Sequence, residues 1–199
     1  MQVTAIRATE SPMQLISEAA GMCYGKGDYN PKRVRRCIEN GHTSVIEHVS
    51  ATFRIEGISR SCLAQLTRHR MASFSVMSQR YCEIGGDDWY VIPPSVVEAG
   101  EEVGFCAETD KAAKAYRRMI AKGVKREDAR FLLPEATKTS LVMTINMRSL
   151  QNFLSLRLDK AAQWEIRELA EQIEQALMEI GGEWSELMAL LREVRNAQR

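Results

Sequence analysis

The residues from Gln65 to Tyr81 concentrate arginines, serines and a histidine in one short stretch. The guanidinium groups of Arg68, Arg70 and Arg80 would repel one another unless anions lay between them. Arginine suits phosphate, because its planar fork donates two parallel charge-assisted hydrogen bonds and keeps its charge. The stretch therefore predicts a site for a polyanionic ligand. The alternative is the solvated basic end of a helix.

A second group of polar residues lies later in the chain, at Arg148, Asn152 and Arg157. On a helix, Arg148 and Asn152 share one face, whereas Arg157, about two and a half turns beyond Arg148, points to the opposite side. We therefore expect this helix to present polar side chains to two different surroundings. The simplest reason would be ligand sites on both sides, one of them at a subunit interface. The alternative is a pair of exposed arginines.

Other classes of site have weaker support in the sequence. The three histidines occur without H-E-x-x-H or paired-cysteine spacing, so we predict no metal site. No G-x-S-x-G elbow is present, so Ser78 is expected to bind phosphate rather than to act as a nucleophile. Gly25-Lys26-Gly27 lacks the remaining glycines of a dinucleotide-binding fingerprint and is expected to be a turn.

Length and composition narrow the class of protein. The chain has 199 residues, enough for one domain with a buried core. Its 27 Lys and Arg residues balance 26 Asp and Glu residues, and a net charge of +1 argues against a protein that coats nucleic acid. The five cysteines are scattered without a C-x-x-C pair, as in a cytosolic protein with reduced thiols. Because no apolar run reaches the roughly 20 residues of a membrane helix, we expect a soluble cytoplasmic protein that binds neither nucleic acid nor membrane.

Hydrophobic periodicity and turn residues predict a helix-rich α+β domain with a small sheet. The expected strands span Val3 to Thr9, Val49 to Glu56, where Gly57 ends the strand, and Ser140 to Asn146. The expected helices begin at Pro12 with Ser11 as N-cap, at Pro31, after a cap at Ser59 or Ser61, and at Met147, Ala161 and Trp184. A further helix is expected from Ser95 to Lys122, with interruptions near Gly100 and Gly104, and another from Arg126 to Leu133, where Pro134 stops it.

Two loops are expected in the first half of the chain. Ser73 to Arg80 is rich in serine and is predicted to approach a ligand, with Ser78-Gln79-Arg80 at its tip. Glu83 to Pro94 is predicted to be a second loop and a candidate lid. The helix that precedes the first loop would deliver Arg68, His69 and Arg70 at its C-terminal end, where cations complement the helix dipole.

The residues of the basic stretch closely resemble the signature of flavin-dependent thymidylate synthases, the ThyX family. The shared pattern is Arg68-His69-Arg70-x-x-Ser73-x-x-x-x-Ser78-x-Arg80-Tyr81. Further matches to the family are Gly41-His42-x-Ser44-x-x-Glu47-His48, Ala129-Arg130-x-x-Leu133-Pro134, Asn146-x-Arg148-Ser149-Leu150-x-Asn152-Phe153, Arg157 and Ala162-Gln163-Trp164-Glu165-Ile166. The resemblance covers roughly residues 1 to 190.

This resemblance implies a fold, a reaction and an assembly. The fold would be that of the thymidylate synthase-complementing proteins, a single domain over residues 1–199 with a small, mostly antiparallel central sheet. The enzyme would convert dUMP to dTMP with FAD as cofactor, methylenetetrahydrofolate as one-carbon donor and NADPH as reductant. It would be a homotetramer in which several subunits build each active site.

The resemblance also implies roles for individual residues. Those that would hold FAD are Ser44, Arg68, His69, Arg70, Val76, Asn146, Met147, Arg148 and Asn152. Those that would hold dUMP are Gln65, Arg68, Val76, Ser78, Gln79, Arg80, Arg130 and Arg157. Arg157 would be catalytic, because a fixed cation beside the uracil N3 lowers the pKa of that nitrogen. His42 and Glu47 are further candidates.

Two departures from the family pattern keep an alternative open. Ser75 and Val76 stand where the family often has Asn and Glu, and Ala161 lies near a position where it often has His. Val76 cannot accept a hydrogen bond or carry a charge. The alternative is therefore a paralogue that binds flavin and nucleotide but has lost or altered the methyl transfer. An RNA-binding protein is a third interpretation, which the near-neutral charge and the few aromatic residues near the stretch disfavour.

Overall fold

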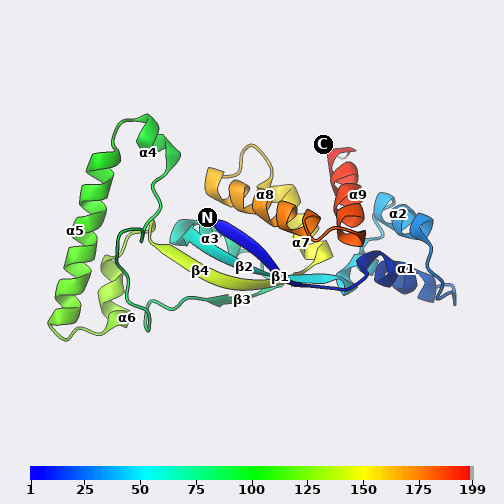
Figure 1. Ribbon diagram of the computed structural model, residues 1–199, viewed down its shortest axis with the longest axis horizontal. Coiled ribbons are helices and arrows are strands. Elements are labelled where there is room, and N and C mark those ends of the chain that lie inside the picture. The colour runs from blue at the N-terminus through cyan, green and yellow to red at the C-terminus, as the bar shows by residue number, and fades with distance from the viewer. Residues whose placement is uncertain (198–199) are drawn as a thin grey trace. The chain divides into compact units, whose positions relative to one another are not determined.

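Four strands form one sheet in the order β1-β2-β4-β3 in the computed structural model, which describes residues 1–197 (Figure 1). The elements in chain order are β1 (Gln2–Ala8), α1 (Pro12–Met22), α2 (Pro31–Glu39), the 3-10 helix η1 (Thr43–His48), β2 (Ser50–Ser59), α3 (Arg60–Leu66), β3 (Ala72–Val76), α4 (Pro94–Glu98), α5 (Glu102–Ala121), α6 (Arg126–Ala129), the 3-10 helix η2 (Arg130–Leu132), β4 (Lys138–Asn146), α7 (Met147–Arg157), α8 (Trp164–Met178) and α9 (Glu183–Ala197). The predicted helix-rich α+β class with a small antiparallel sheet is confirmed.

Period-two alternation in the strands gives the sheet one apolar face. In β4, the buried side chains of Leu141, Met143 and Ile145 alternate with more exposed ones. On the opposite face the hydroxyl groups of Thr52 and Thr144 are hydrogen-bonded at 3.0 Å. Helices α7 and α8 pack together on the apolar face (Figure 1).

Contacts divide the described chain into two compact units. Unit 1 comprises residues 1–55, 66–75 and 142 onward, and unit 2 comprises residues 56–65 and 76–141. Unit 1 holds most of the buried apolar side chains. Examples are Ile16, Phe53, Phe153 and Leu191. Unit 2 has a smaller core of Ile84, Trp89, Ala113, Tyr116 and Ala129. None of the helices in residues 1–197 is both long and apolar enough to span a membrane.

Helix α7 begins and ends where the sequence predicts. Its N-cap, Asn146, accepts a hydrogen bond at 2.9 Å from the backbone N–H of Ser149, which satisfies a donor that the first turn would otherwise leave unpaired. Helix α8 begins at Trp164 rather than at Ala161, because the side chain of Gln163 caps it by accepting from the N–H groups of Glu165 and Ile166.

Two local predictions are wrong, and a third is right only in part. Ser73 to Arg80 is not a loop throughout: residues 72–76 form β3, with Ser73 and Ser75 on the exposed side of a period-two pattern. Strand β2 does not end at Gly57 but runs on to Ser59, and Gly57 accommodates this with a φ of 76°. Ser11 is the N-cap residue of α1, as predicted, but its side chain makes no capping hydrogen bond.

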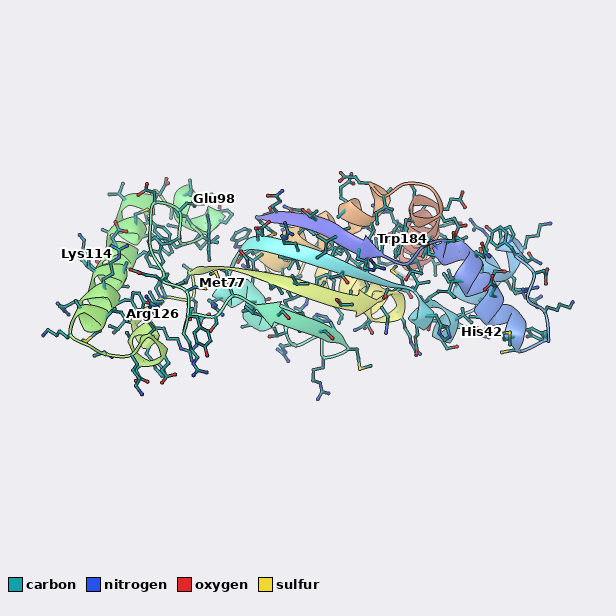
Figure 2. The ribbon with its side chains drawn as sticks, turned by 60° about the horizontal axis from the view of Figure 1, so that its bottom comes forward. His42, Met77, Glu98, Lys114, Arg126 and Trp184 are labelled. Atoms are coloured by element: carbon teal, nitrogen blue, oxygen red, sulfur yellow. The ribbon has the colours of Figure 1, made fainter. Side chains whose placement is uncertain are left out.

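The cap of α1 comes from the other end of the chain. The carboxylate of Glu183 accepts hydrogen bonds from the N–H groups of Met13 at 2.8 Å and Gln14 at 3.2 Å. The neighbouring Trp184 donates its indole N–H to the carbonyl of Thr9 at 2.9 Å (Figure 2). The start of α9 therefore holds the connection between β1 and α1.

The long predicted helices of unit 2 are divided. The helix expected over residues 95–122 is interrupted at Gly100, which has a φ of 70°, so that α4 and α5 are separate. The expected interruption at Gly104 does not occur, because that residue lies within α5. The helix expected from Arg126 to Leu133 becomes α6 followed by η2.

Candidate functional site

An open depression of about 760 Å³ lies on unit 1, and its lining is strongly cationic. It is lined by Glu47, Arg68, His69, Arg70, Met71, Asn146, Arg148, Ser149, Asn152, Leu156 and Arg157. We call it the arginine depression. It brings together residues from η1, from the turn after α3, and from α7 and its cap.

The turn after α3 positions the basic triplet. Helix α3 is capped as predicted, because the Ser59 hydroxyl accepts from the N–H of Cys62 at 3.0 Å. It ends at Leu66, whose carbonyl accepts from the N–H of His69 at 3.1 Å. Arg68, His69 and Arg70 therefore follow the helix instead of belonging to its last turn.

Helix α7 corrects the prediction for Arg148 and Arg157. The two arginines line the same depression and do not face two different surroundings. At roughly 100° per residue they lie at the two margins of one exposed face, with Ser149 and Leu156 between them. Their long side chains reach over that face, while Leu150 and Leu154 on the other side of the helix are buried. The helix geometry thus gives no argument for sites on both sides of α7.

A single carboxylate contributes to the lining of the arginine depression. Glu47 forms a hydrogen-bonded ion pair with Arg148, and both side chains are about half exposed. The other charged lining residues are Arg68, Arg70 and Arg157, so positive charge is in excess.

His69 contacts Arg157 inside the depression. The Nε–H of Arg157 donates to Nε2 of His69 at 3.1 Å. The imidazole also packs against Phe153 edge to face, with ring centroids 4.9 Å apart and an interplanar angle of 79°. Burial, followed by the charges of Arg157 and Arg68, holds the pKa of His69 below its ordinary value.

Unit 2 carries a separate cationic group around residues 77–81, which we call the Arg80 loop. Nε of Arg80 donates to the Glu127 carboxylate at 3.0 Å, and the Arg80 guanidinium lies over the Tyr81 ring at 5.6 Å from its centroid. The Ser78 hydroxyl accepts from the N–H of Arg80 at 3.2 Å. Nε of Arg130 donates to the backbone carbonyl of Glu127 at 3.0 Å, so the same residue contacts both arginines.

The structure adds Arg60 to this group. One of its Nη atoms donates to the carbonyl of Met77 at 3.0 Å, while its Nε is buried without a hydrogen-bond partner (Met77 and Arg126 mark this part of unit 2 in Figure 2). Burial, followed by the charge of Arg130, lowers the pKa of the Arg60 guanidinium. A signal was available in the sequence, because Arg60 begins the helix whose cap was predicted, but its contact with Met77 depends on the path of the chain after β3.

The sequence-predicted site residues are distributed between the two units. Arg68, His69, Arg70, Asn146, Arg148, Asn152, Arg157 and Glu47 line the arginine depression. Gln65, Val76, Ser78, Gln79, Arg80 and Arg130 belong to unit 2, where Val76 is the last residue of β3.

Three predicted residues of unit 1 do not line the depression. The Met147 side chain is fully buried and its N–H donates to the carbonyl of Val49 at 2.8 Å, because the start of α7 packs into the core. Ser44 lies within η1, and the exposed His42 precedes η1, which packs against α1 (Figure 2).

Met71, Ser149 and Leu156 line the depression without having been predicted. Leu156 is 55% exposed and Met71 is 74% exposed, so both offer apolar surface to a ligand. Leu156 continues the face of Arg148 and Asn152 at a spacing of four residues, and this pattern could have identified it. Met71 has no such pattern.

The chemistry of the depression suits a ligand with several negative charges and a flat apolar part. Guanidinium groups provide paired donors for phosphate oxygens, and the amide of Asn152 adds neutral donors and an acceptor. Because Asn146 uses its Oδ1 as a helix cap, it has its NH₂ group to offer. Neither an obvious nucleophile nor a cluster of acids lines the depression.

A known protein family and several of its members resemble this chain over most of its length. The family described as "Thymidylate synthase complementing protein" matches residues 4–180. The flavin-dependent thymidylate synthase of Pyrococcus furiosus is 40% identical over 189 residues, covering 85% of this chain and 76% of the relative. That of Geobacter sulfurreducens is 39% identical over 186 residues, covering 87% of this chain and 80% of the relative.

Solved structures extend the similarity to the fold. The Helicobacter pylori flavin-dependent thymidylate synthase ThyX, complexed with FAD and dUMP, has a TM-score of 0.78 at 28% identity and covers 98% of this chain and 99% of that one. The UMP/dUMP methylase PolB of Streptomyces cacaoi, bound with 5-Br dUMP, has a TM-score of 0.81 at 26% identity and covers 98% and 94%. The chain therefore belongs to the thymidylate synthase complementing protein family.

Proposed function

We propose that this protein is a flavin-dependent thymidylate synthase, with residues 1–199 acting as one catalytic domain. It would convert dUMP to dTMP with methylenetetrahydrofolate as one-carbon donor and NADPH as reductant. The observation that carries the proposal is the arginine depression, in which the signature residues Arg68, His69 and Arg70 lie beside Arg148 and Asn152.

The residues of the depression fit FAD. The FAD diphosphate would meet Arg68, Arg70 and Arg148, each contact contributing about 1.5–3 kcal/mol as a charge-assisted hydrogen bond. A depression of about 760 Å³ lies within the range of roughly 300–1,000 Å³ that is usual for small-molecule sites. When bound, the flavin would supply the electron transfer that the side chains of this chain cannot provide.

Arg157 would act on the substrate ring. Placed beside the uracil N3, its guanidinium would stabilise the anionic ring and so lower the pKa of that nitrogen. Arg157 cannot itself lose a proton at physiological pH, so its contribution would be electrostatic and orientational.

The nucleotide phosphate would be bound from unit 2. Ser78, Gln79 and Arg80 would contact it together with Arg130, while Gln65 and Arg68 would orient the nucleoside. In this structure the Glu127 carboxylate accepts a hydrogen bond from Arg80. Exposed ion pairs of this kind contribute only about 0.2–1 kcal/mol, so a phosphate dianion can replace the carboxylate.

The experiment is a flavin titration followed by an assay of product. The purified protein should be yellow or should take up added FAD, and dUMP should shift its absorption spectrum. Incubation with dUMP, methylenetetrahydrofolate and NADPH should then yield dTMP. A colourless protein that takes up no FAD would refute the proposal.

A second candidate function rests on Val76. Without a carboxylate at this position the chain could be a paralogue that binds flavin and nucleotide with lost or altered methyl transfer. Bleaching of the flavin by NADPH without any dTMP would favour this candidate. Because the similar PolB is a UMP/dUMP methylase, the assay should include UMP, and a product from UMP alone would identify altered specificity. The Val76→Glu variant tests the position itself, since a gain in dTMP formation would show that Val76 limits turnover.

We further propose a cytoplasmic homotetramer with active sites shared between subunits. Phe131 and Val103 are 84% and 83% exposed, which is unusual for apolar side chains of their size unless another chain covers them. The absence of disulfides in residues 1–197 agrees with a reducing compartment. Sedimentation analysis tests the assembly, and a Phe131→Glu variant should dissociate it. A wild-type protein that sediments as a monomer with FAD and dUMP present would refute the tetramer.

A further inference from the structure

The contact between His69 and Arg157 defines the protonation state of the imidazole. A guanidinium has only N–H donors, and Arg157 cannot deprotonate. The 3.1 Å hydrogen bond from its Nε–H therefore requires a lone pair on Nε2 of His69. An imidazole with that lone pair is neutral and carries its proton on Nδ1, whereas the imidazolium ion has two donors and would repel the guanidinium.

The surroundings of His69 favour the same state. Arg68 and Arg70 flank it in the chain, and Arg148 and Arg157 line the same depression from α7. The opposing carboxylate of Glu47 is bonded to Arg148. A proton added to His69 would therefore place a positive charge near four guanidinium groups and only one carboxylate, which is unfavourable.

Phe153 fixes the orientation of the ring. It is fully buried, it lies one helical turn before Arg157 on α7, and it meets the imidazole edge to face at 4.9 Å. Such aromatic pairs prefer this geometry. Phe153 and Arg157 therefore hold the imidazole from the same helix, and Nε2 points at the arginine.

We propose that His69, as the neutral Nδ1–H tautomer, is a positioning residue that holds the guanidinium of Arg157. The hydrogen bond uses the Nε–H of Arg157, so His69 does not consume the fork of the two Nη groups. That fork is the part of the side chain that would donate to an anionic ring. The structural half of this proposal is the neutral tautomer and its hydrogen bond to Arg157, and it stands on its own. The catalytic half is the effect of that hydrogen bond on turnover, and it rests on the proposed role of Arg157.

The structural half is tested by nitrogen NMR of the full-length protein labelled at histidine. The chain has three histidines, so His42→Gln and His48→Gln variants assign the remaining signal. We expect His69 to be the Nδ1–H tautomer and to titrate below 6.5, its ordinary value. The Arg157→Met variant should raise the pKa of His69, because it removes both the donor and a nearby charge.

Arg148→Met is the matched control, since it removes a charge from the same depression without removing a partner of His69. It should move the pKa of His69 less than Arg157→Met does. An Nε2–H tautomer, or a pKa that Arg157→Met leaves unchanged, would overturn the proposal. These results are independent of turnover, so they hold whether or not the protein forms dTMP.

The catalytic half is tested by replacing the acceptor. The amide oxygen of His69→Gln can still accept from Arg157 but does not titrate, whereas His69→Leu offers no acceptor. We expect kcat for dTMP to fall about 10- to 100-fold in His69→Leu, the range for loss of a charged hydrogen bond, and to be partly restored in His69→Gln. The acid limb of the wild-type pH profile should be absent in His69→Gln. Equal losses in both variants with an unchanged acid limb would contradict a positioning role.

Discussion

The two units place their arginines in different ways. In unit 1 the arginines emerge from α7 and from a hydrogen-bonded turn, both next to a large buried core that includes Phe153, Leu150 and Leu154. In unit 2 they lie on the Arg80 loop and on the short elements α6 and η2, beside a small core. In unit 2 the arginines are positioned by polar contacts, such as the ion pair of Arg80 with Glu127, more than by apolar packing.

Buried polar atoms show the same difference. In residues 1–197, the buried side-chain atoms that lack a hydrogen-bond partner are Nε of Arg60, the Tyr116 hydroxyl and Oγ1 of Thr139, all in unit 2. In unit 1 the buried Glu174 is hydrogen-bonded by Arg195 at 2.7 Å and by Arg192 at 2.9 Å. Among the described residues, buried side-chain atoms of this kind therefore occur in unit 2, where ordered water or a ligand can satisfy them.

The largest expected effect is the loss of turnover in Arg157→Ala. If unit 1 holds the chemical step, this change should lower kcat for dTMP about 10²- to 10³-fold, as removal of a donor that stabilises a developing anion does. FAD should stay bound, because the other arginines of the depression are intact, and absorbance of the desalted protein measures this. Loss of the flavin would mean that Arg157 holds the cofactor instead.

The next largest effect should come from the buried ion pair that joins α8 to α9. Glu174→Gln removes the negative charge between two arginines, and Arg195 is only 7% exposed. Leaving a buried charge uncompensated costs about 3–5 kcal/mol, which denaturant unfolding would measure. Glu193→Gln, which breaks an exposed pair with Arg35, should cost less than about 1 kcal/mol. Equal effects would mean that burial does not distinguish these two pairs.

Arg60→Met tests whether Arg60 contributes to nucleotide binding in unit 2. If Arg60 faces the nucleotide phosphate together with Arg130, the variant should bind dUMP about 10- to 100-fold more weakly, as for the loss of a charge-assisted contact. A spectral titration of the flavin-loaded protein measures the affinity. Lys114→Met, on the exposed surface of α5 (Figure 2), is the matched control and should leave it unchanged. If Arg60→Met binds dUMP as tightly as the wild type, Arg60 does not contact the nucleotide and serves only to hydrogen-bond the carbonyl of Met77.

A smaller effect is expected from pH, through His69. Burial, followed by Arg157 and Arg68, lowers the pKa of folded His69 below its ordinary value of 6.5. As pH falls, the unfolded chain takes up this proton first, so the contribution of His69 to stability is complete above pH 6.5 and is lost as pH falls through the folded pKa. The free energy of unfolding of the wild type should therefore fall more than that of His69→Gln between pH 7.5 and 5.5. A parallel decline of the two proteins would contradict the assigned pKa shift.

The smallest effect should come from Tyr116→Phe. The Tyr116 hydroxyl is buried without a hydrogen-bond partner, so its removal should be neutral or stabilising by up to about 1 kcal/mol. Tyr90→Phe is a control in the same unit, because the neighbouring Cys106 raises the pKa of the Tyr90 hydroxyl to about 12, and loss of this interacting hydroxyl should destabilise the protein. Destabilisation by Tyr116→Phe would indicate that ordered water satisfies this hydroxyl.

Local rules predicted those parts of the fold that local interactions determine. Helix α7 has its predicted bounds because Asn146 caps it three residues from its partner Ser149. The cap of α1 could not be predicted, because Glu183 lies 170 residues from Met13. Strand β3 was missed because its serines resemble a loop until a neighbouring strand pairs with them.

The candidate site shows the same limit. The adjacent residues Arg68, His69 and Arg70 identified a cationic group, although the sequence placed it at the end of a helix and not in the turn that follows α3. The approach of Arg157 to His69 depends instead on the packing of α7 against the turn after α3, across 88 residues of sequence. The angular argument for Arg157 failed because it placed the Cα atom correctly but ignored the length of the side chain.

The ion pairs of Glu47 with Arg148 and of Glu127 with Arg80 have a consequence for selectivity. A carboxylate tethered beside its arginine competes at a fixed effective concentration, which is commonly in the millimolar range. An incoming anion must bind better than a carboxylate to displace it, and a phosphate group with its double charge and three oxygens does so. Organic acids, which offer nothing more than a second carboxylate, are held back by the same competition. If phosphorylated ligands bind at these arginines, each pair would favour them over carboxylates only modestly, because exposed ion pairs contribute about 0.2–1 kcal/mol.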